Sequence, residues 1–292
     1  MKIVLLGRDG QVGSQLRRSL LPLGQVVALG RHELCLENLS ALNQLLNEKN
    51  PNLIVNAAAY TAVDKAETEQ HTAFLLNANV VNVLADYAKR NDALLVHYST
   101  DYVFDGEKDA PYLETDSTNP QNVYGASKLA GERILHQSGC RFLNFRTSWV
   151  FSATGHNFIN IILKLAKDKG EIRIVADQYG APTSAEMIAD VTALAIASER
   201  KGHIETGTYH LTSAGKISWH GLACYAVERV LMNGEKLKLK VENILPISTD
   251  EYPLPAKRPK NSILDNSALS NALDLYRSDW SVYVDRMLEC VA

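Results

Sequence analysis

Three residue types that can pass a proton to a carbonyl oxygen occur together in the middle of the chain. Thr100 stands at the end of an expected strand, and Tyr124 and Lys128 follow on an expected helix. Residues four positions apart share one helix face, so Tyr124 and Lys128 point the same way. A neighbouring ammonium lowers a tyrosine pKa from its usual value of about 10. We therefore expect Tyr124 to be a general acid, Lys128 to tune it, and Thr100 to orient the substrate oxygen.

An exposed Tyr-x-x-x-Lys pair without any catalytic role would have the same sequence, and the chain contains 12 tyrosines. Tyr124 and Lys128 form the single match to this spacing in the chain. The loop Asn119–Asn122 comes directly before them, and a strand-end hydroxyl lies at a suitable separation. These surroundings favour the catalytic interpretation.

A second signal stands at the start of the chain, where Gly7, Gly10 and Gly13 separate a short apolar run from an amphipathic segment. Gly7 allows a sharp turn, Gly10 a close approach to a pyrophosphate, and Gly13 tight packing of the helix on the sheet. The helix N-terminus supplies free N–H groups and partial positive charge for phosphates. A tight structural turn is the alternative. Together with the catalytic set, the loop indicates a nicotinamide-dependent reductase.

The exit of the second expected strand bears on the choice of cofactor. NAD-selective folds place Asp or Glu there, on the ribose hydroxyls. This chain has Gly30 and then Arg31, whose planar fork can pair with a 2′-phosphate. We therefore expect NADPH, with NADH as an alternative donor. A solvated surface cation is the competing interpretation of Arg31.

Short apolar runs alternate with amphipathic stretches through the first half of the chain. This pattern predicts right-handed βαβ units and a Rossmann-type, doubly wound parallel sheet. The expected strands are 2–6, 26–29, 53–56, 94–97 and 142–145, and the expected helices are 11–21, 39–48, 71–90 and 124–137.

The pattern loosens after Trp149. Helices are expected over 158–167, 219–232 and 280–288, and a capping box at Thr183 and Glu186 predicts a helix running to about residue 198. We expect residues 1–150 to form the dinucleotide-binding domain. Residues 151–292 are expected to form mainly a smaller substrate-binding lobe, with some segments returning to the sheet.

The bulk composition excludes several function classes. A net charge of -3 offers no basic face for nucleic acid or anionic membranes. The four cysteines are scattered and show no zinc-ligand spacing, so no metal is predicted. The apolar start is too short for a signal core, and we expect a cytoplasmic protein.

These residues resemble the extended short-chain dehydrogenase/reductase family over nearly the whole chain. The resemblance rests on six stretches: Gly7–Gly13, Val55–Glu67, Ser99–Gly106, Arg146–Val150, Asp177–Thr183 and Arg258–Ser262. It implies the last step of dTDP-L-rhamnose synthesis, in which NAD(P)H reduces the C4 ketone of dTDP-4-dehydro-L-rhamnose. The product would feed a cell-surface polysaccharide such as O-antigen.

The resemblance also implies roles for individual residues. The cofactor would be contacted by Gly10, Gln11, Val12, Ala59, Tyr60, Thr61, Tyr98, Tyr124 and Lys128. The sugar nucleotide would be contacted by Thr100, Asp101, Trp149, Gln178, Thr183 and Arg258. Purely structural roles are the alternatives for three of these residues: Trp149 as a core aromatic, Asp101 as a turn cap, and Arg258 as the partner of a surface carboxylate. His97 and His210 are expected to pack or cap rather than catalyse.

The chain departs from the family pattern at two places. Family members often carry Asp near the second-strand exit, close to the adenine, where this chain has Cys35 and then Leu36. Some members hold Mg²⁺ at a dimer interface through glutamates, one of them in the first helix, where this chain has Gln15. The first departure weakens strict NADH use. The second removes support for a metal, and it leaves a homodimer open.

Two rival functions remain at the level of sequence. One is another nucleotide-sugar 4-ketoreductase or an epimerase, which would show no net NADPH consumption. The other is a non-catalytic regulatory subunit on the same fold, against which the intact set of Thr100, Tyr124 and Lys128 argues.

Overall fold

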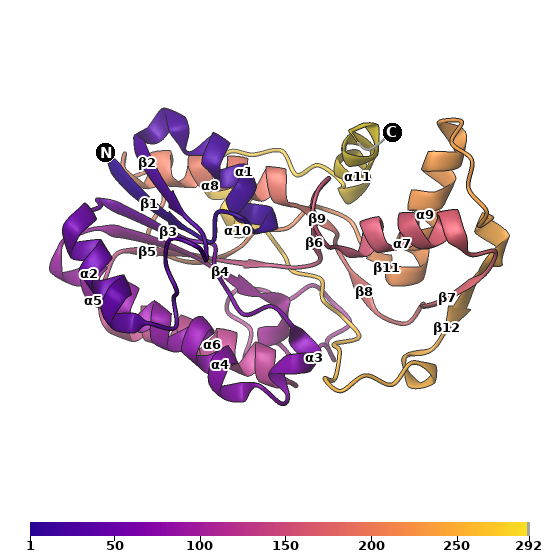
Figure 1. The fold of residues 1–292 in the computed structure, drawn as a ribbon, viewed down its shortest axis with the longest axis horizontal. Helices are drawn as coiled ribbons and strands as arrows, with labels where there is room; N and C mark the ends of the chain where they lie inside the picture. Colours follow the sequence, from indigo (N-terminus) through magenta and orange to yellow (C-terminus); the bar gives the residue numbers. More distant parts are fainter. Residues whose placement is uncertain (291–292) are drawn as a thin grey trace.

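A computed structural model describes residues 1–290 and has a six-stranded parallel sheet at its centre (Figure 1). The order across the sheet is β10-β5-β4-β3-β1-β2. The strands are β1 (Lys2–Leu6), β2 (Gln25–Leu29), β3 (Leu53–Asn56), β4 (Leu94–Thr100), β5 (Phe142–Thr147) and β10 (Gly207–His210). The doubly wound parallel sheet predicted from the sequence is confirmed.

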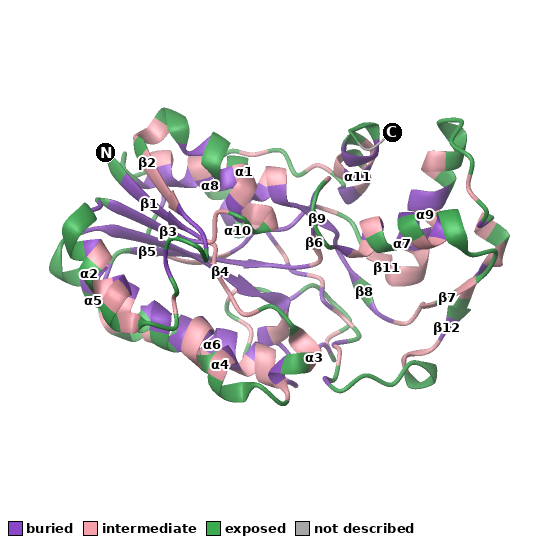
Figure 2. Cartoon of the chain, viewed as in Figure 1, coloured by how far each residue is buried: buried purple, intermediate pink, exposed green. Residues whose placement is uncertain are grey.

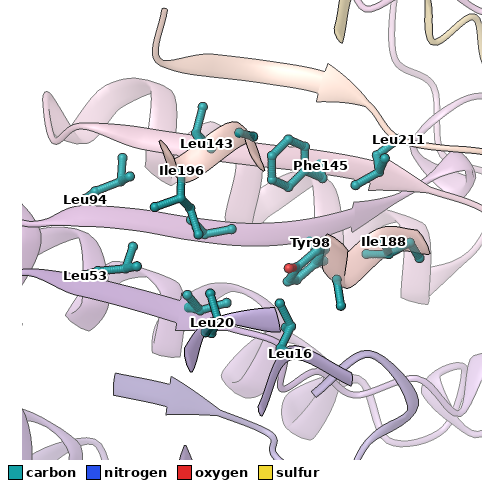
Figure 3. Close-up of a cluster of buried hydrophobic side chains, with 14 of the residues drawn as sticks. Leu16, Leu20, Leu53, Leu94, Tyr98, Leu143, Phe145, Ile188, Ile196 and Leu211 are labelled. Carbon is teal, nitrogen blue, oxygen red and sulfur yellow. The ribbon is translucent and has the colours of Figure 1, made fainter. Parts of the chain in front are cut away.

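Helices cover both faces of this sheet, which is why β1 and β3 are almost continuous apolar runs. Every residue of β3, β4 and β5 is buried (Figure 2). One face packs on α1 (Gln11–Ser19) and α8 (Ala185–Glu199), where Leu16, Leu20 and Ile188 meet in one cluster (Figure 3). The other face packs on α2 (Leu39–Lys49), α5 (Val80–Arg90) and α6 (Val123–Ser138).

The chain leaves β1 for β2 on one side and later returns to place β3 on the other. The carboxyl ends of β1 and β3 therefore flank the point where the strand order reverses, which is where such sheets bind ligands. The loops that follow these strands begin at Gly7 and Ala57.

The helical stretch between β3 and β4 is longer and less regular than a single helix. The sequence predicts one helix over 71–90, and the structure has α4 (Gln70–Phe74), a π-helical turn at Leu75–Asn79 and then α5. The wider turn buries Asn77 completely. Hydrophobic periodicity gives no signal for such a turn, because the apolar face continues through it.

Residues after the sheet's fifth strand build a second body at the opposite end of the molecule from the N-terminus (Figure 1). Its helices are α7 (Phe158–Asp168), α9 (Trp219–Met232) and α11 (Trp280–Glu289). Three short strand pairs join them: β6 (Val150–Phe151) with β9 (Thr183–Ser184), β8 (Tyr179–Gly180) with β11 (Ile217–Ser218), and β7 (Ile172–Val175) with β12 (Ile244–Ile247).

The remaining helices of the molecule are short. They are α3 (Val63–Ala66), α10 (Ser267–Ala272), and the 3₁₀ turns Leu21–Leu23, Asp101–Val103, Val241–Asn243 and Thr249–Glu251.

Three segments from the second half of the chain lie with the sheet. Strand β10 extends its edge beside β5, α8 packs against α1, and α10 (Ser267–Ala272) packs against β10. The division of the chain at residue 150 stays a prediction, since these segments cross that boundary.

The capping box expected at the start of α8 is wrong. The residue before the helix is Ser184, and no side chain caps the helix there. Thr183 donates its hydroxyl to the Ala181 carbonyl instead, and Glu186 pairs with Arg286. Both side chains are therefore engaged by other partners, one local and one from α11.

No helix within residues 1–290 is both long and apolar enough to cross a membrane. In the same part of the chain, no three His, Cys, Asp or Glu side chains gather in a way that could hold a metal ion.

Candidate active site

The three proton-handling residues meet where β4 ends against the start of α6. Thr100 is the last residue of β4, and its hydroxyl is close enough to the phenol of Tyr124 to influence the pKa of that group. Asn122 starts α6 by accepting a hydrogen bond from the Gly125 amide at 2.8 Å, which satisfies an otherwise unpaired helix-end donor. A Cβ on Gly125 would lie 2.2 Å from the Tyr102 carbonyl oxygen, so only glycine lets the helix approach so closely.

The structure corrects the expected electrostatics of Tyr124. Burial, together with the negative charge of Asp101, raises the pKa of Tyr124 to about 12, although the neighbouring Thr100 hydroxyl acts in the opposite direction. Lys128 is not among the groups that lower this pKa, and burial brings the pKa of Lys128 itself down to about 8. The phenol therefore keeps its proton at neutral pH and is a donor rather than a phenolate.

The Lys128 ammonium group points into the protein. Its Nζ lies 3.3 Å from Nε2 of His97, and the other ring nitrogen of His97 lies 3.2 Å from the Asn56 side-chain amide. All three side chains are almost fully buried. Burial and the charge of Lys128 hold the pKa of His97 well below its usual value, so the imidazole is neutral.

Asp101 sits next to Thr100 with only 4% of its surface exposed. One carboxylate oxygen accepts a hydrogen bond from the Thr100 hydroxyl at 2.9 Å. The other oxygen is buried and has no hydrogen-bond partner within residues 1–290. Burial raises the pKa of Asp101 to about 6, although the nearby hydroxyls of Ser262 and Thr100 act in the opposite direction. A buried polar atom left unpaired in this way fits a site that a ligand completes.

The glycine loop has the geometry that a dinucleotide needs. Gly7 has a φ of +79°, and a Cβ there would lie 2.6 Å from the Ala58 amide nitrogen. A Cβ on Gly13 would lie 2.0 Å from the Gly7 carbonyl oxygen. No side chain caps the α1 terminus at Gly10, so the amides of Gln11 and Val12 face a free helix end. These residues fit a pyrophosphate.

The loop after β3, with Ala59, Tyr60 and Thr61, is held in place from the π-helical turn. Asn77 accepts a hydrogen bond from the Tyr60 amide at 2.9 Å and donates to the Tyr60 carbonyl at 3.1 Å. It also donates to the Ser127 hydroxyl on α6 at 2.9 Å. Asn77 therefore fixes the expected cofactor loop to the catalytic helix. Sequence reasoning missed it because its signal is a local helix distortion.

The exit of β2 carries a charge pair that the sequence did not reveal. Arg8 pairs with Glu33 at 2.6 Å, and Glu33 also accepts a hydrogen bond from the Gly30 amide at 2.9 Å. The loop of Gly7 and the end of β2 are joined, because Gly7 donates to the Leu29 carbonyl. The Glu33 carboxylate thus lies at the exit of β2, where NAD-selective folds carry Asp or Glu.

The other residues expected at the adenosine end follow β2 on the connection to α2. Arg31 and Cys35 are exposed, and Leu36 is half-buried against the core beneath α2. No contact within residues 1–290 joins them to the catalytic set.

Tyr98 does not reach the catalytic residues with its side chain. Side chains alternate along a strand, so Tyr98 points to the face opposite His97. Its ring packs in the core near Leu20 and Ile188 (Figure 3), and its hydroxyl is 2.9 Å from that of Thr192. The Tyr98 side chain therefore lies away from His97 and Lys128, and its expected contact with the cofactor stays a prediction.

A cleft of about 730 Å³ lies beside the catalytic set and reaches into the second body. Tyr102, Gln178, Trp219 and Arg258 are among its lining residues. Tyr102 also touches Tyr124 edge-on, with ring centroids 5.8 Å apart, and so connects the wall of the cleft to the catalytic tyrosine. Sequence reasoning did not select Tyr102, although it lies within the Ser99–Gly106 stretch.

Three other residues expected at the substrate have distinct surroundings. Arg258 pairs with Asp64 at 2.7 Å while it lines the cleft, and Gln178 donates to the Thr249 hydroxyl. Thr183 is fully buried in β9, with its hydroxyl bound to the Ala181 carbonyl. The structure therefore brings Arg258 and Gln178 to the cleft and does not bring Thr183 there.

Trp149 is held in a strained position between the two bodies. Its φ is +47°, a left-handed value that costs energy for a bulky residue. Its indole stacks on Trp219 with centroids 3.4 Å apart, and a Cβ on Gly180 would lie 2.4 Å from the same indole. Packing on both sides fixes its orientation.

Comparison with known proteins gives one consistent family. The family model of the RmlD substrate binding domain matches residues 1–292. A curated dTDP-4-dehydrorhamnose reductase from Burkholderia thailandensis is 49% identical over 284 residues, which cover 96% of this chain and 95% of the relative. A relative of the same name from Escherichia coli K12 is 44% identical and covers 99% and 97%.

Solved structures agree. The crystal structure of a dTDP-4-dehydrorhamnose reductase from Clostridium acetobutylicum matches with a TM-score of 0.90 and 34% identity, over 100% of this chain and 99% of that chain. The enzyme of the same name from Bacillus anthracis, solved in complex with NADP, matches with a TM-score of 0.87 and 32% identity, over 99% and 98%. The chain belongs to the RmlD substrate binding domain family, to which these dTDP-4-dehydrorhamnose reductases are its full-length relatives.

Proposed function

We propose that this protein uses NADPH, or NADH in its place, to reduce the C4 ketone of dTDP-4-dehydro-L-rhamnose to dTDP-L-rhamnose. The observation that carries the proposal is the meeting of Thr100, Tyr124 and Lys128 between the glycine loop and the large cleft. The names of its full-length relatives support the same reaction.

The reduction adds a hydride to the carbonyl carbon and a proton to its oxygen. The nicotinamide supplies the hydride when the cofactor is bound. Thr100 orients the carbonyl oxygen through its hydroxyl, and Tyr124 donates its phenolic proton to the oxygen as negative charge develops there. Asp101, with one oxygen free of partners, is placed to accept a hydrogen bond from a sugar hydroxyl.

Lys128 is the residue that would hold the nicotinamide ribose, and the helix end at Gly10, Gln11 and Val12 would hold the pyrophosphate. The Arg8–Glu33 pair and Arg31 lie at the adenosine end. A carboxylate there suits ribose hydroxyls, whereas a free arginine suits a 2′-phosphate. The presence of both supports the use of either cofactor, and the relative solved with NADP supports NADPH.

The cleft is the proposed place of the dTDP moiety. Its walls are mostly apolar, with Arg258 and Gln178 as polar groups. A charged pyrophosphate next to a flat base needs this combination of a cation and apolar walls. Trp149, locked between Trp219 and Gly180, would present its edge to the sugar.

A homodimer and a cytoplasmic location stay predictions. An epimerase and a regulatory subunit stay rivals, and one assay separates all three functions.

That assay follows the loss of absorbance at 340 nm with purified protein, NADPH and dTDP-4-dehydro-L-rhamnose. We expect steady, sugar-dependent oxidation of NADPH and formation of dTDP-L-rhamnose. An altered sugar without net oxidation would identify an epimerase. Tight NADPH binding with no change in the sugar would favour a regulatory subunit or another 4-keto sugar as substrate.

A further inference from the structure

The catalytic lysine has an unusual partner. Lys128 is 2% exposed, and within residues 1–290 its Nζ makes a hydrogen bond only with Nε2 of His97, at 3.3 Å. A buried ammonium is normally paired with a carboxylate, because burial of an unpaired charge is costly. Here the pairing group is a neutral ring.

The nearest carboxylate on the same helix is already committed elsewhere. Glu132 follows Lys128 by one turn, and both of its oxygens bind the guanidinium of Arg146, at 2.9 and 2.7 Å. That ion pair is itself buried. Glu132 therefore contributes charge at a distance, and the direct contact with Lys128 is left to His97.

His97 is built to make this contact. It lies on β4 directly beside Asn56 of β3, and the two side chains are 3.2 Å apart. Asn56 in turn accepts a hydrogen bond from the Ala58 amide, in the expected cofactor loop. One chain of contacts thus runs from that loop through Asn56 and His97 to the catalytic lysine.

We propose that His97 is a positioning residue for the reduction: its neutral imidazole, oriented by Asn56, holds the Lys128 ammonium next to the cofactor ribose and Tyr124. This role rests on the proposed function of the site. For Nε2 to accept from Lys128, the proton of the neutral ring must be on Nδ1. The Asn56 amide, whose nitrogen faces Nδ1 and whose oxygen faces the Ala58 amide in the structure, must then turn its oxygen to Nδ1 and give up the hydrogen bond from Ala58.

Charges around the lysine decide how its protonation responds to a change at His97. Burial lowers the pKa of Lys128 to about 8, and the negative charge of Glu132 opposes that fall. The ionisable groups facing this part of the site from the neighbouring elements are His97, Asp101, Tyr124, Glu132 and Arg146. Removal of the one direct acceptor leaves the ammonium with its burial cost and less compensation, so its pKa falls further.

The test compares His97→Leu, which removes the acceptor, with His97→Gln, which keeps an amide oxygen as one. We expect His97→Leu to lower kcat by about 10- to 100-fold, the worth of one hydrogen bond to a charged group. Activity that needs the ammonium is lost as pH rises through the Lys128 pKa. The alkaline limb of kcat/KM should therefore move to lower pH in His97→Leu and return towards wild type in His97→Gln.

NADPH binding, measured by fluorescence titration without sugar, is the second readout. His97→Leu should weaken it several-fold, and more strongly at pH 8 than at pH 6. The matched control is His210→Gln, since His210 is also a fully buried histidine but lies outside the site. Thermal melts of all variants show which of them are folded.

A folded His97→Leu protein with wild-type kcat, pH profile and NADPH affinity would overturn the proposal. So would a His97→Gln protein that loses as much as His97→Leu, because a merely structural role predicts no rescue. A wild-type protein that binds NADPH but reduces no dTDP-sugar would instead refute the proposed function, and the binding titrations would still report on His97.

Discussion

The phenol of Tyr124 is protonated at neutral pH, because burial raises its pKa to about 12. A proton donor with this pKa works when the alkoxide that it serves is more basic than its own phenolate. Tyr124→Phe should therefore lower kcat by about 10²- to 10⁴-fold, the usual effect of losing a positioned acid. NADPH affinity should change little. Steady-state kinetics check this, with Tyr87→Phe as a buried tyrosine control outside the site; unchanged turnover in Tyr124→Phe would remove the phenol from the mechanism.

The buried carboxyl of Asp101 lowers the free energy of unfolding at neutral pH, because burial disfavours its ionised form. Its pKa rises from 3.8 to about 6 in the folded protein, so folding favours the protonated carboxyl. That favourable contribution is complete below about pH 4 and is lost as pH rises through 6. Asp101→Asn does not titrate, so its stability relative to wild type should increase by about 2 kcal/mol between pH 4 and pH 7.

Urea unfolding at several pH values measures this difference for Asp101→Asn. A stability difference that is constant with pH would mean that the carboxyl titrates normally in the folded protein. Turnover of the same variant should fall, because the charged acceptor facing the sugar is lost.

We expect the choice between cofactors to depend on Arg8 in the loop after β1 and on Arg31 and Glu33 after β2. Arg8 is engaged by Glu33, whereas Arg31 is exposed. Arg31→Ala should weaken NADPH binding about tenfold and spare NADH, because only NADPH offers a 2′-phosphate to the guanidinium. Glu33→Gln should shift the preference towards NADPH, because it removes a repulsive charge and frees Arg8. Titrations of both cofactors check this, with Arg17→Ala as a surface control; equal effects on NADPH and NADH would exclude Arg31 from selectivity.

Among the structural elements, the glycine loop combines two roles that can be separated. A Cβ on Gly13 would lie 2.0 Å from the Gly7 carbonyl oxygen, while a Cβ on Gly10 would come no closer than 3.3 Å to that atom. Gly13→Ala should push α1 off the sheet and lower both the melting temperature and NADPH affinity. Gly10→Ala should lower the melting temperature much less, because the Gly7 carbonyl has to shift only slightly, and it should weaken NADPH binding by crowding the pyrophosphate position.

Gly170→Ala is the control for this pair, because a Cβ at Gly170 meets nothing within 4 Å. Melting curves and NADPH titrations on the three variants distinguish the two roles. Equal destabilisation by Gly10→Ala and Gly13→Ala would show that both glycines serve packing alone.

The elements that the sequence predicts well are those with long periodic patterns. The helix expected over 219–232 has those bounds in α9, and the one expected over 158–167 ends one residue later in α7. The pairs β6–β9 and β8–β11 have two residues per strand, too few for any alternation to register, and the chain brings their partners from distant positions. Tyr124 and Lys128 could be selected from the sequence because their spacing is one helix turn. Asn77 and Glu33 could not be selected, because Asn77 is placed by a π-helical turn and the Glu33 side chain turns back to the Gly30 amide.

At the scale of the whole molecule, the sheet and the second body meet around the cleft through a few specific ties. The Trp149–Trp219 stack joins the end of β5 to α9, and the Arg258–Asp64 pair joins the C-terminal segment to α3. Gln11 adds a third tie, because its side-chain oxygen accepts hydrogen bonds from Ser152 and Asn157. The same residue thus stands at the cofactor helix and at the entrance of the second body.

Two arginines line this cleft and allow a direct test of where the nucleotide diphosphate binds. Arg258 is 15% exposed and lies near Tyr102, whereas Arg173 is 64% exposed and only loosely paired with Glu251. A buried cation contributes more to anion binding than a solvated one. Arg258→Ala should therefore raise KM for the dTDP-sugar by about 10- to 100-fold, with a small change in kcat and unchanged NADPH affinity. Arg173→Ala should alter KM less than threefold. A larger increase in KM for Arg173→Ala than for Arg258→Ala would place the diphosphate at the outer end of the cleft and reverse the proposed orientation of the substrate.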